Sequence, residues 1–96
     1  MLVIVSYDVS TETAAGRRRL RHVARMCKDF GQRVQKSVFE CKVGEKEMVV
    51  LRSLLVKKIN PEEDSLRLYL LDRDMEGKIE HYGINKPVDL AGPLLV

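Results

Sequence analysis

Two kinds of apolar spacing alternate along this chain, and this alternation is the feature that most limits its fold. Two segments carry apolar residues three or four positions apart, so we expect helices over residues 14–30 and 45–59. Short segments with β-branched runs or alternating apolar residues precede, separate and follow them. These segments, which we expect to be strands, cover residues 2–8, 33–43, 64–71 and 78–82.

The order of these segments points to one architecture. The polar stretch Gln35-Lys36-Ser37 interrupts the segment 33–43, which therefore forms two short strands or one sharply bent strand. Counted as two strands, the order is βαββαβ, an α+β fold in which an antiparallel sheet carries two helices on one face. We therefore predict a single ferredoxin-like sandwich over residues 1–84, followed by a short tail over residues 85–96.

Composition excludes several classes of protein. Apolar residues make up 45% of the 96-residue chain and charged residues 32%, which indicates a globular domain. The apolar run 2–5 has no basic segment before it, so it predicts a strand and not a signal peptide. No apolar stretch approaches the roughly 20 residues of a membrane span. Cys27 and Cys41 lack close His partners, so we expect buried free thiols in a reducing, cytoplasmic setting.

Positive charge is concentrated in one third of the chain. The net charge is +3, but residues 16–36 carry +7 and the remainder −4. The basic residues of this segment are Arg17, Arg18, Arg19, Arg21, Arg25, Lys28, Arg33 and Lys36. Four of them lie on another stripe of the helix 14–30 than its apolar residues: Arg17, Arg21, Arg25 and Lys28. We expect that helix to end at Gly31. A local positive surface favours binding of nucleic acid, with a solvated helix surface as the alternative.

Asp8 is the best candidate for metal chemistry. It ends the first predicted strand next to Tyr7, and adjacent strand residues point to opposite faces. Carboxylate oxygens suit a hard cation such as Mg²⁺, but a single carboxylate supplies few protein ligands for a catalytic metal ion. The other candidate acids are scattered: Asp64, Asp72, Asp74 and Asp89. A two-fold dimer would supply a second Asp8, whereas the structural alternative is that Asp8 caps the following turn.

Other arrangements for catalysis are weaker. His22 lies beside the arginine stripe and His81 in a late strand, and neither cysteine has a clear His partner. We expect His22 to contact phosphate or to have no role. There is also no glycine-rich phosphate loop and no aromatic strip for stacking bases.

The apolar segment 88–96 predicts self-association. An exposed apolar strand on a small soluble protein invites pairing with another chain. We expect the tail to close a homodimer by packing across it, with packing on its own sheet as the alternative.

The segments 3–9, 19–24, 30–31 and 33–40 together resemble one known family. Tyr7-Asp8, followed about thirty residues later by the segment 35–40 (Gln-Lys-Ser-Val-Phe-Glu), is a specific combination, and the segments 64–69 and 79–83 also fit. The chain resembles the CRISPR-associated protein two family, the small subunit of the spacer-acquisition machinery. It departs from the family at His22, where a basic residue is expected.

The resemblance implies a ferredoxin-like homodimer whose C-terminal strand crosses to the partner. It implies a Mg²⁺- or Mn²⁺-dependent endonuclease on RNA or double-stranded DNA, with Asp8 as the metal-binding and catalytic residue. Basic contacts would fall on Arg19, Arg21 and Arg33, and we add Arg17 from the same helix. Tyr7, Ser37 and Phe39 would support the site.

The resemblance leaves two functions open, and the fold allows a third. Some family members look like metal-dependent nucleases; in others the dimer looks like a non-catalytic DNA-binding bridge between two integrase subunits. A toxin-type ribonuclease on a similar fold, outside any CRISPR locus, is the third.

Overall fold

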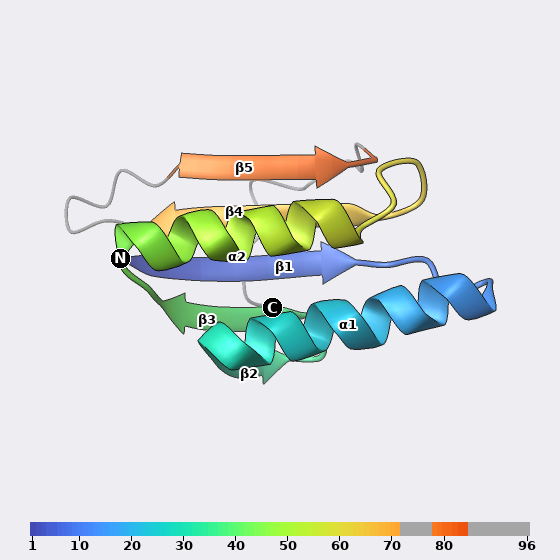
Figure 1. Ribbon diagram of the computed structural model, residues 1–96, viewed down its shortest axis with the longest axis horizontal. Helices are drawn as coiled ribbons and strands as arrows, with labels where there is room; N and C mark the ends of the chain where they lie inside the picture. The colour runs from blue at the N-terminus through green and yellow to red at the C-terminus, as the bar shows by residue number, and fades with distance from the viewer. Residues whose placement is uncertain (72–77, 85–96) are drawn as a thin grey trace.

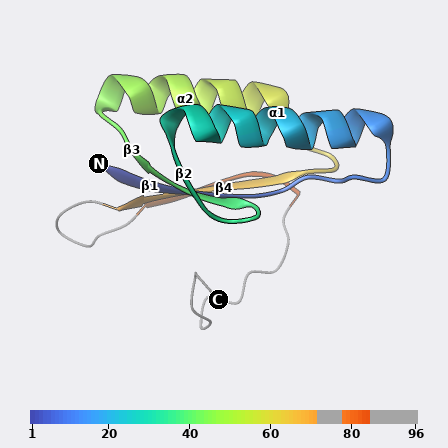
Figure 2. The same cartoon turned by 90° about the horizontal axis from the view of Figure 1, so that it is seen from below.

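The computed structural model describes residues 1–71 and 78–84 and shows one antiparallel sheet with two helices on one face (Figures 1 and 2). The strands lie in the order β2-β3-β1-β4-β5. Their bounds are β1 (Leu2–Asp8), β2 (Gly31–Gln35), β3 (Val38–Lys42), β4 (Ser65–Leu71) and β5 (Lys78–Gly83). The helices are α1 (Ala14–Phe30) and α2 (Glu45–Lys58). The predicted ferredoxin-like fold is confirmed, and the segment 33–43 forms two strands.

The predicted tail over residues 85–96 lies outside the described residues. The expectation that it packs across a dimer therefore stays a prediction. Among the described residues, neither helix has the length and apolar content needed to cross a bilayer.

Strand β1 is the central strand and separates the two faces of the sheet. It pairs with β3 on one side and with β4 on the other, both antiparallel. Val3, Val5 and Tyr7 point toward the helices and are buried in the core. The intervening residues, which include Ile4 and Asp8, point to the opposite face. We call this opposite side, which carries neither helix, the open face (Figure 2).

Each helix completes the core with one apolar face. Val23 and Cys27 of α1 are fully buried, as are Leu51 and Leu55 of α2. They pack against the β1 and β4 side chains that point toward the helices. Burial of apolar side chains is the main favourable contribution to folding, at about 1.5–3 kcal/mol for each fully buried Val or Leu relative to an exposed position. Both cysteines are buried free thiols, as predicted.

The start of α1 is pressed against the loop that follows β1. Thr13 caps the helix, its hydroxyl oxygen accepting a hydrogen bond from the Gly16 amide at 3.0 Å. A Cβ at Gly16 would lie 2.0 Å from the carbonyl oxygen of Ser10, so only glycine permits this approach. The loop between β1 and α1 is therefore held closely by the helix that it leads into.

Gly31 ends α1 as predicted, but for a different physical reason. Its backbone is extended (φ −167°, ψ −158°), and it is already the first residue of β2. A Cβ there would lie 2.1 Å from the Glu40 carbonyl oxygen and 2.6 Å from Cys41 Sγ. The glycine is needed for the close approach of β2 to β3 and not for a left-handed helix cap.

Candidate metal centre and nucleic-acid interface

Asp8 lies where the sequence placed it, at the last position of β1. Its side chain is exposed, and its position pairs with Ser65, the first residue of β4. Tyr7, its neighbour, is buried at 4% exposure and points to the helix side. The alternation of the strand thus separates the two residues onto opposite faces, and of the two only Asp8 is exposed to solvent.

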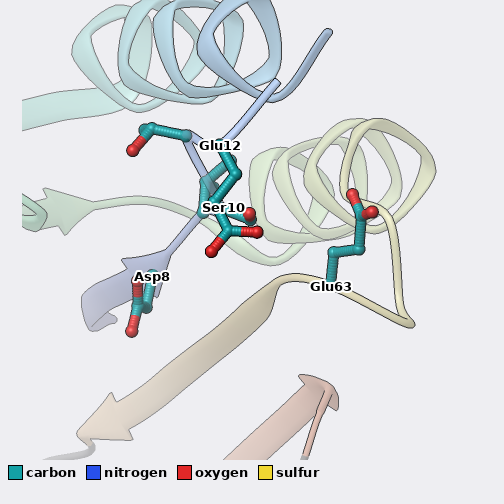
Figure 3. A pocket seen from close by; sticks show the side chains of 6 residues that line it. Asp8, Ser10, Glu12 and Glu63 are labelled. Carbon is teal, nitrogen blue, oxygen red and sulfur yellow. The ribbon is translucent and has the colours of Figure 1, made fainter. Parts of the chain in front are cut away.

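Asp8 borders an open polar hollow of about 450 Å³ at this end of the sheet. The rest of the lining comes from Val9, Ser10, Thr11, Glu12 and Glu63. Figure 3 shows that Asp8, Glu12 and Glu63, which line the hollow, lie on three different segments: the strand end, the β1–α1 loop and the α2–β4 loop. The hollow is therefore rich in oxygen atoms, of the kind that hard divalent cations bind.

The donor set of a single chain is nevertheless incomplete. In the described part of the chain, no three or more His, Cys, Asp or Glu residues are grouped so that they could hold a metal ion. Mg²⁺ or Mn²⁺ fits the chemistry of Asp8, because these ions accept carboxylate oxygen and retain several waters. One protomer offers at most part of such a site.

Tyr7, Phe39 and Arg33 form a stack on the helix side of the sheet. The Tyr7 and Phe39 rings lie 6.3 Å apart at 21°, and the Arg33 guanidinium lies 5.2 Å from the centre of the Phe39 ring. The Tyr7 hydroxyl donates to the Lys36 carbonyl at 3.4 Å, and burial raises its pKa. These residues lie together, but the sheet separates the two rings from the Asp8 carboxylate.

Ser37 lies in the turn between β2 and β3. Its carbonyl oxygen accepts a hydrogen bond from the Tyr7 amide at 3.1 Å. The observed contact is thus made by the backbone of Ser37. It ties the turn to β1 one residue before Asp8.

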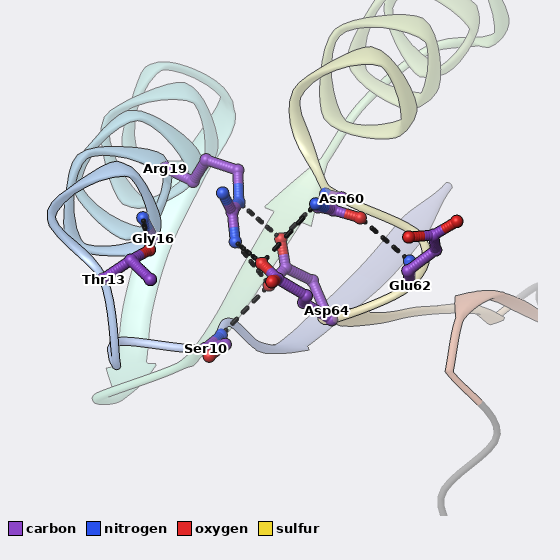
Figure 4. Close-up of polar contacts among 8 residues, drawn as sticks. Ser10, Thr13, Gly16, Arg19, Asn60, Glu62 and Asp64 are labelled. Atoms are coloured by element: carbon purple, nitrogen blue, oxygen red, sulfur yellow. Dashed lines mark hydrogen bonds and ion pairs between the residues drawn. The ribbon is translucent and has the colours of Figure 1, made fainter.

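Arg19 differs from the other candidate arginines because carboxylates within the protein bind its guanidinium. Its Nε donates to Asp64 Oδ2 at 2.8 Å (Figure 4). Its Nη2 donates to Glu63 Oε2 at 2.8 Å. The Arg19 side chain is only 16% exposed and that of Asp64 is fully buried. Burial alone would raise the pKa of Asp64, but hydrogen bonds from Arg19, Asn60 and Ser10 outweigh it, and the pKa lies below its ordinary value.

Arg17, Arg21 and Arg33 remain exposed. Arg17 Nη1 donates to the Thr11 carbonyl at 3.0 Å, which lays its side chain along the β1–α1 loop. Arg21 lies one helical turn beyond Arg17 on α1, so the two share a side of the helix. These arginines therefore add positive charge to the exposed surface.

His22 lies among cations on the exposed surface of α1. The nearby ammonium group of Lys58 in α2 is the main cause that lowers the pKa of His22. Desolvation and the charges of Arg25, Arg21 and Arg18 lower it further. The positive surface of α1 therefore extends across to the end of α2.

Comparison with known proteins identifies the family. The model of the family described as CRISPR associated protein Cas2 matches residues 1–79. The chain belongs to the Cas2 family. The CRISPR-associated endoribonuclease Cas2 of Chlorobaculum tepidum is 53% identical over 96 residues, covering all of both chains. The CRISPR-associated endonuclease Cas2 of Halalkalibacterium halodurans is 45% identical over 95 residues, covering 99% of each.

A solved Cas2 structure also resembles this chain. The crystal structure of Streptococcus pyogenes Cas2 at pH 6.5 superposes with a TM-score of 0.70 and 55% identity. It covers 77% of this chain and 89% of that one. The family resemblance drawn from Tyr7-Asp8 and the segment 35–40 is thus confirmed.

Sequence reasoning missed the role of Asp64 in this Cas2 chain. Asp64 was one of four scattered acids, yet it is the buried centre of a network that joins α1, the β1–α1 loop and the α2–β4 loop. Its partners Ser10 and Arg19 are 54 and 45 residues away. The only local signal is its place at the start of a strand, shortly after Asn60-Pro61.

Proposed function

We propose that this Cas2 chain is a metal-dependent endonuclease that works as a homodimer in CRISPR spacer acquisition. The observation that carries the proposal is the exposed Asp8 carboxylate at the end of the central strand, on the sheet face opposite both helices. Curated relatives named endoribonuclease and endonuclease support nuclease chemistry. Asp8 would supply the metal ligand from each protomer, and RNA or double-stranded DNA would be the substrate.

The open face supports the dimer. An apolar hollow of about 280 Å³ on this face is lined mainly by Leu2, Ile4, Val38, Tyr69 and Leu71. An isologous pairing brings the same patch of both chains together. Because Asp8 shares this face, two sheets meeting face to face would bring the two carboxylates toward one another and complete the ligand set that one chain lacks.

The chain's own residues would divide the work between binding and chemistry. Asp8 would hold Mg²⁺ or Mn²⁺, and the bound ion would acidify water and neutralise charge at the scissile phosphate. Arg17 and Arg21 would hold the flanking backbone, and Arg33, kept in place by Phe39, would add a contact at the sheet edge. Tyr7 and Ser37 would keep the end of β1 in place from the helix side.

The cleavage test compares wild type with Asp8→Asn on labelled RNA and duplex DNA, with Mg²⁺, with Mn²⁺ and with chelator. The matched control is Glu12→Gln, a carboxylate that lines the same hollow. We expect wild type and Glu12→Gln to cleave with metal only, and Asp8→Asn to lose activity by at least tenfold. Metal-dependent cleavage that survives in Asp8→Asn would refute the assignment of Asp8.

The dimer test measures the oligomeric state of the variant Ile79→Lys by analytical sedimentation. The Ile79 side chain is half exposed on the open face. The matched control is Val50→Lys, because Val50 is an equally exposed apolar residue on α2. We expect Ile79→Lys alone to shift the protein to monomer. A monomeric wild type would refute the shared metal site.

The second candidate is a non-catalytic DNA-binding scaffold that bridges integrase subunits. The absence of a complete metal-ligating cluster among the described residues favours it, as does the exposed arginine surface of α1. For a scaffold, Asp8→Asn leaves spacer acquisition intact in cells. Charge reversal at Arg17 and Arg21 abolishes it, and normal acquisition in that variant would exclude the scaffold.

A further inference from the structure

We propose that the buried ion pair of Asp64 and Arg19 is the positioning element that fixes the Asp8 carboxylate. The inference rests on the proposed role of Asp8 as metal ligand. It gives Arg19 a task different from that of Arg17 and Arg21, since its guanidinium holds the site together in place of contacting phosphate.

Asp64 gathers four N–H donors from three separate segments (Figure 4). Arg19 donates from Nε to Oδ2 at 2.8 Å and from Nη2 to Oδ1 at 3.3 Å. The Asn60 amide donates to Oδ2 at 2.8 Å, and the Ser10 amide donates to Oδ1 at 3.0 Å. Both carboxylate oxygens therefore accept two bonds each, which fixes the orientation of the group.

The Asp64 carboxylate is linked to Asp8 through two neighbouring residues. Ser10, which it binds through the backbone, comes two residues after Asp8. Ser65, which follows Asp64 directly, is the cross-strand partner of Asp8. One buried group thus holds the backbone that follows Asp8 and adjoins the residue of β4 that pairs with Asp8. Gly16, pressed onto the Ser10 carbonyl, braces the loop from the helix.

Positioning explains why a charge is buried here. A buried ion pair is weak evidence for stability, since apolar residues of similar volume often serve as well. What apolar residues do not supply is a directional link between α1 and two loops. A metal site needs such links, because small errors in ligand position cost affinity.

Arg19 also donates from Nη2 to Glu63, which itself lines the hollow beside Asp8. The chain of contacts therefore runs from the wall of the hollow through Arg19 and Asp64 to the backbone beyond Asp8. Glu63 is 46% exposed and supplies the weaker partner. Its removal should perturb the site far less than removal of Asp64.

The test separates positioning from phosphate contact. Arg19→Gln and Asp64→Asn are compared with Arg17→Gln, which removes the same charge from an exposed arginine of α1. The measurements are Mn²⁺ affinity by calorimetry, affinity for duplex DNA without metal, and kcat and KM for cleavage. We expect Arg19→Gln and Asp64→Asn to lower Mn²⁺ affinity and kcat about tenfold or more. Arg17→Gln should instead weaken DNA binding and raise KM, with Mn²⁺ affinity unchanged.

Two further variants distinguish loss of positioning from loss of the folded structure. The double variant Arg19→Gln with Asp64→Asn leaves no unpaired buried charge, and Arg19→Lys keeps the charge without the fork of donors. We expect the double variant to fold yet bind Mn²⁺ weakly, and Arg19→Lys to recover part of the affinity. Unchanged Mn²⁺ affinity and kcat in folded variants would overturn the proposal, as would loss of DNA binding in Arg19→Gln equal to that in Arg17→Gln.

Hydrogen exchange at the Ser10 amide keeps this inference distinct from the proposed function. If Asp8 is not a metal ligand, the wild type will bind no Mn²⁺. If Asp64 is not a positioning element, the Ser10 amide will exchange at the same rate in wild type and Asp64→Asn, with or without Mn²⁺. Faster exchange in the variant is the expected result.

Discussion

Arg52 donates from Nε and Nη2 to the two carboxylate oxygens of Glu80, each at 2.8 Å. This fork joins α2 to β5, an edge strand of the sheet, and the Tyr82 hydroxyl donates to the same carboxylate at 3.3 Å. The two side chains are 32% and 24% exposed, so the pair is partly shielded from water. The contact holds the edge strand against the helix layer.

We expect removal of this pair to destabilise the protein modestly. In a double-mutant cycle of Arg52→Ala and Glu80→Ala, the coupling free energy between the two side chains should be about 1 kcal/mol, as expected for a partly exposed bidentate pair. Urea unfolding measures it, with Arg25→Ala, an exposed arginine of α1, as control. A coupling near zero would mean that solvent screens the pair fully.

The pH dependence of stability should carry the signature of Asp64. The pKa of this carboxyl in the folded protein lies below its ordinary value of 3.8. The unfolded chain therefore binds the proton more readily, and the stabilisation is fully present above pH 3.8 and is lost as the pH falls through the folded pKa. Asp64→Asn lacks this dependence.

Thermal melting of wild type and Asp64→Asn between neutral pH and about pH 2.5 measures this difference. Near neutral pH we expect the variant to be less stable by about 2–4 kcal/mol, because Arg19 loses its buried partner. This difference in unfolding free energy between wild type and Asp64→Asn should become smaller as the pH falls below about 4. A difference that stays constant with pH would mean that the variant loses packing and not a charge interaction.

Gly31 should tolerate no side chain. A Cβ there would meet the Glu40 carbonyl oxygen at 2.1 Å and the Cys41 Cα at 2.8 Å, both on the backbone, so the strands must separate. We expect Gly31→Ala to cost about 2 kcal/mol or more in urea unfolding. The matched control is Gly44→Ala, where the nearest atom is 3.6 Å away. Equal effects of the two substitutions would contradict the close-approach argument.

The fold was predictable because its signals are local. The helical spacing gave α1 at residues 14–30 as observed, and α2 ends one residue earlier than expected, with Ile59 as its cap. The break at Gln35-Lys36-Ser37 correctly marked the turn between β2 and β3. Gly31 shows the limit: a helix-ending glycine was visible, but its contact with Cys41 depends on strand pairing.

The candidate site was predictable only in part, because only some of its features depend on local sequence. The position of Asp8 at a strand end follows from local pattern, and so does its separation from Tyr7. The commitment of Arg19 to Asp64 does not, because it joins residues 45 positions apart. A row of arginines on one helix looks uniform in sequence, although burial gives one of them a different environment.

His22 provides a reporter for nucleic acid on α1. In the free protein its pKa is lowered chiefly by Lys58, and then by desolvation and by neighbouring arginines. A bound phosphate backbone would offset these positive charges and favour the imidazolium, so nucleic-acid binding should raise the pKa of His22. Lys58→Gln should raise it in the free protein, because the main cause of the lowering is removed.

Proton NMR titration of His22 with and without a short DNA duplex measures this effect. His81 is the internal control, because Arg67 donates to its Nδ1 at 3.2 Å on the open face, away from α1. We expect the duplex to raise the pKa of His22, and at a fixed pH to leave the ring-proton chemical shifts of His81 unchanged. If binding changes the chemical shifts of His81 and has no effect on His22, the nucleic acid binds on the open face, and the arginine surface of α1 is not its site.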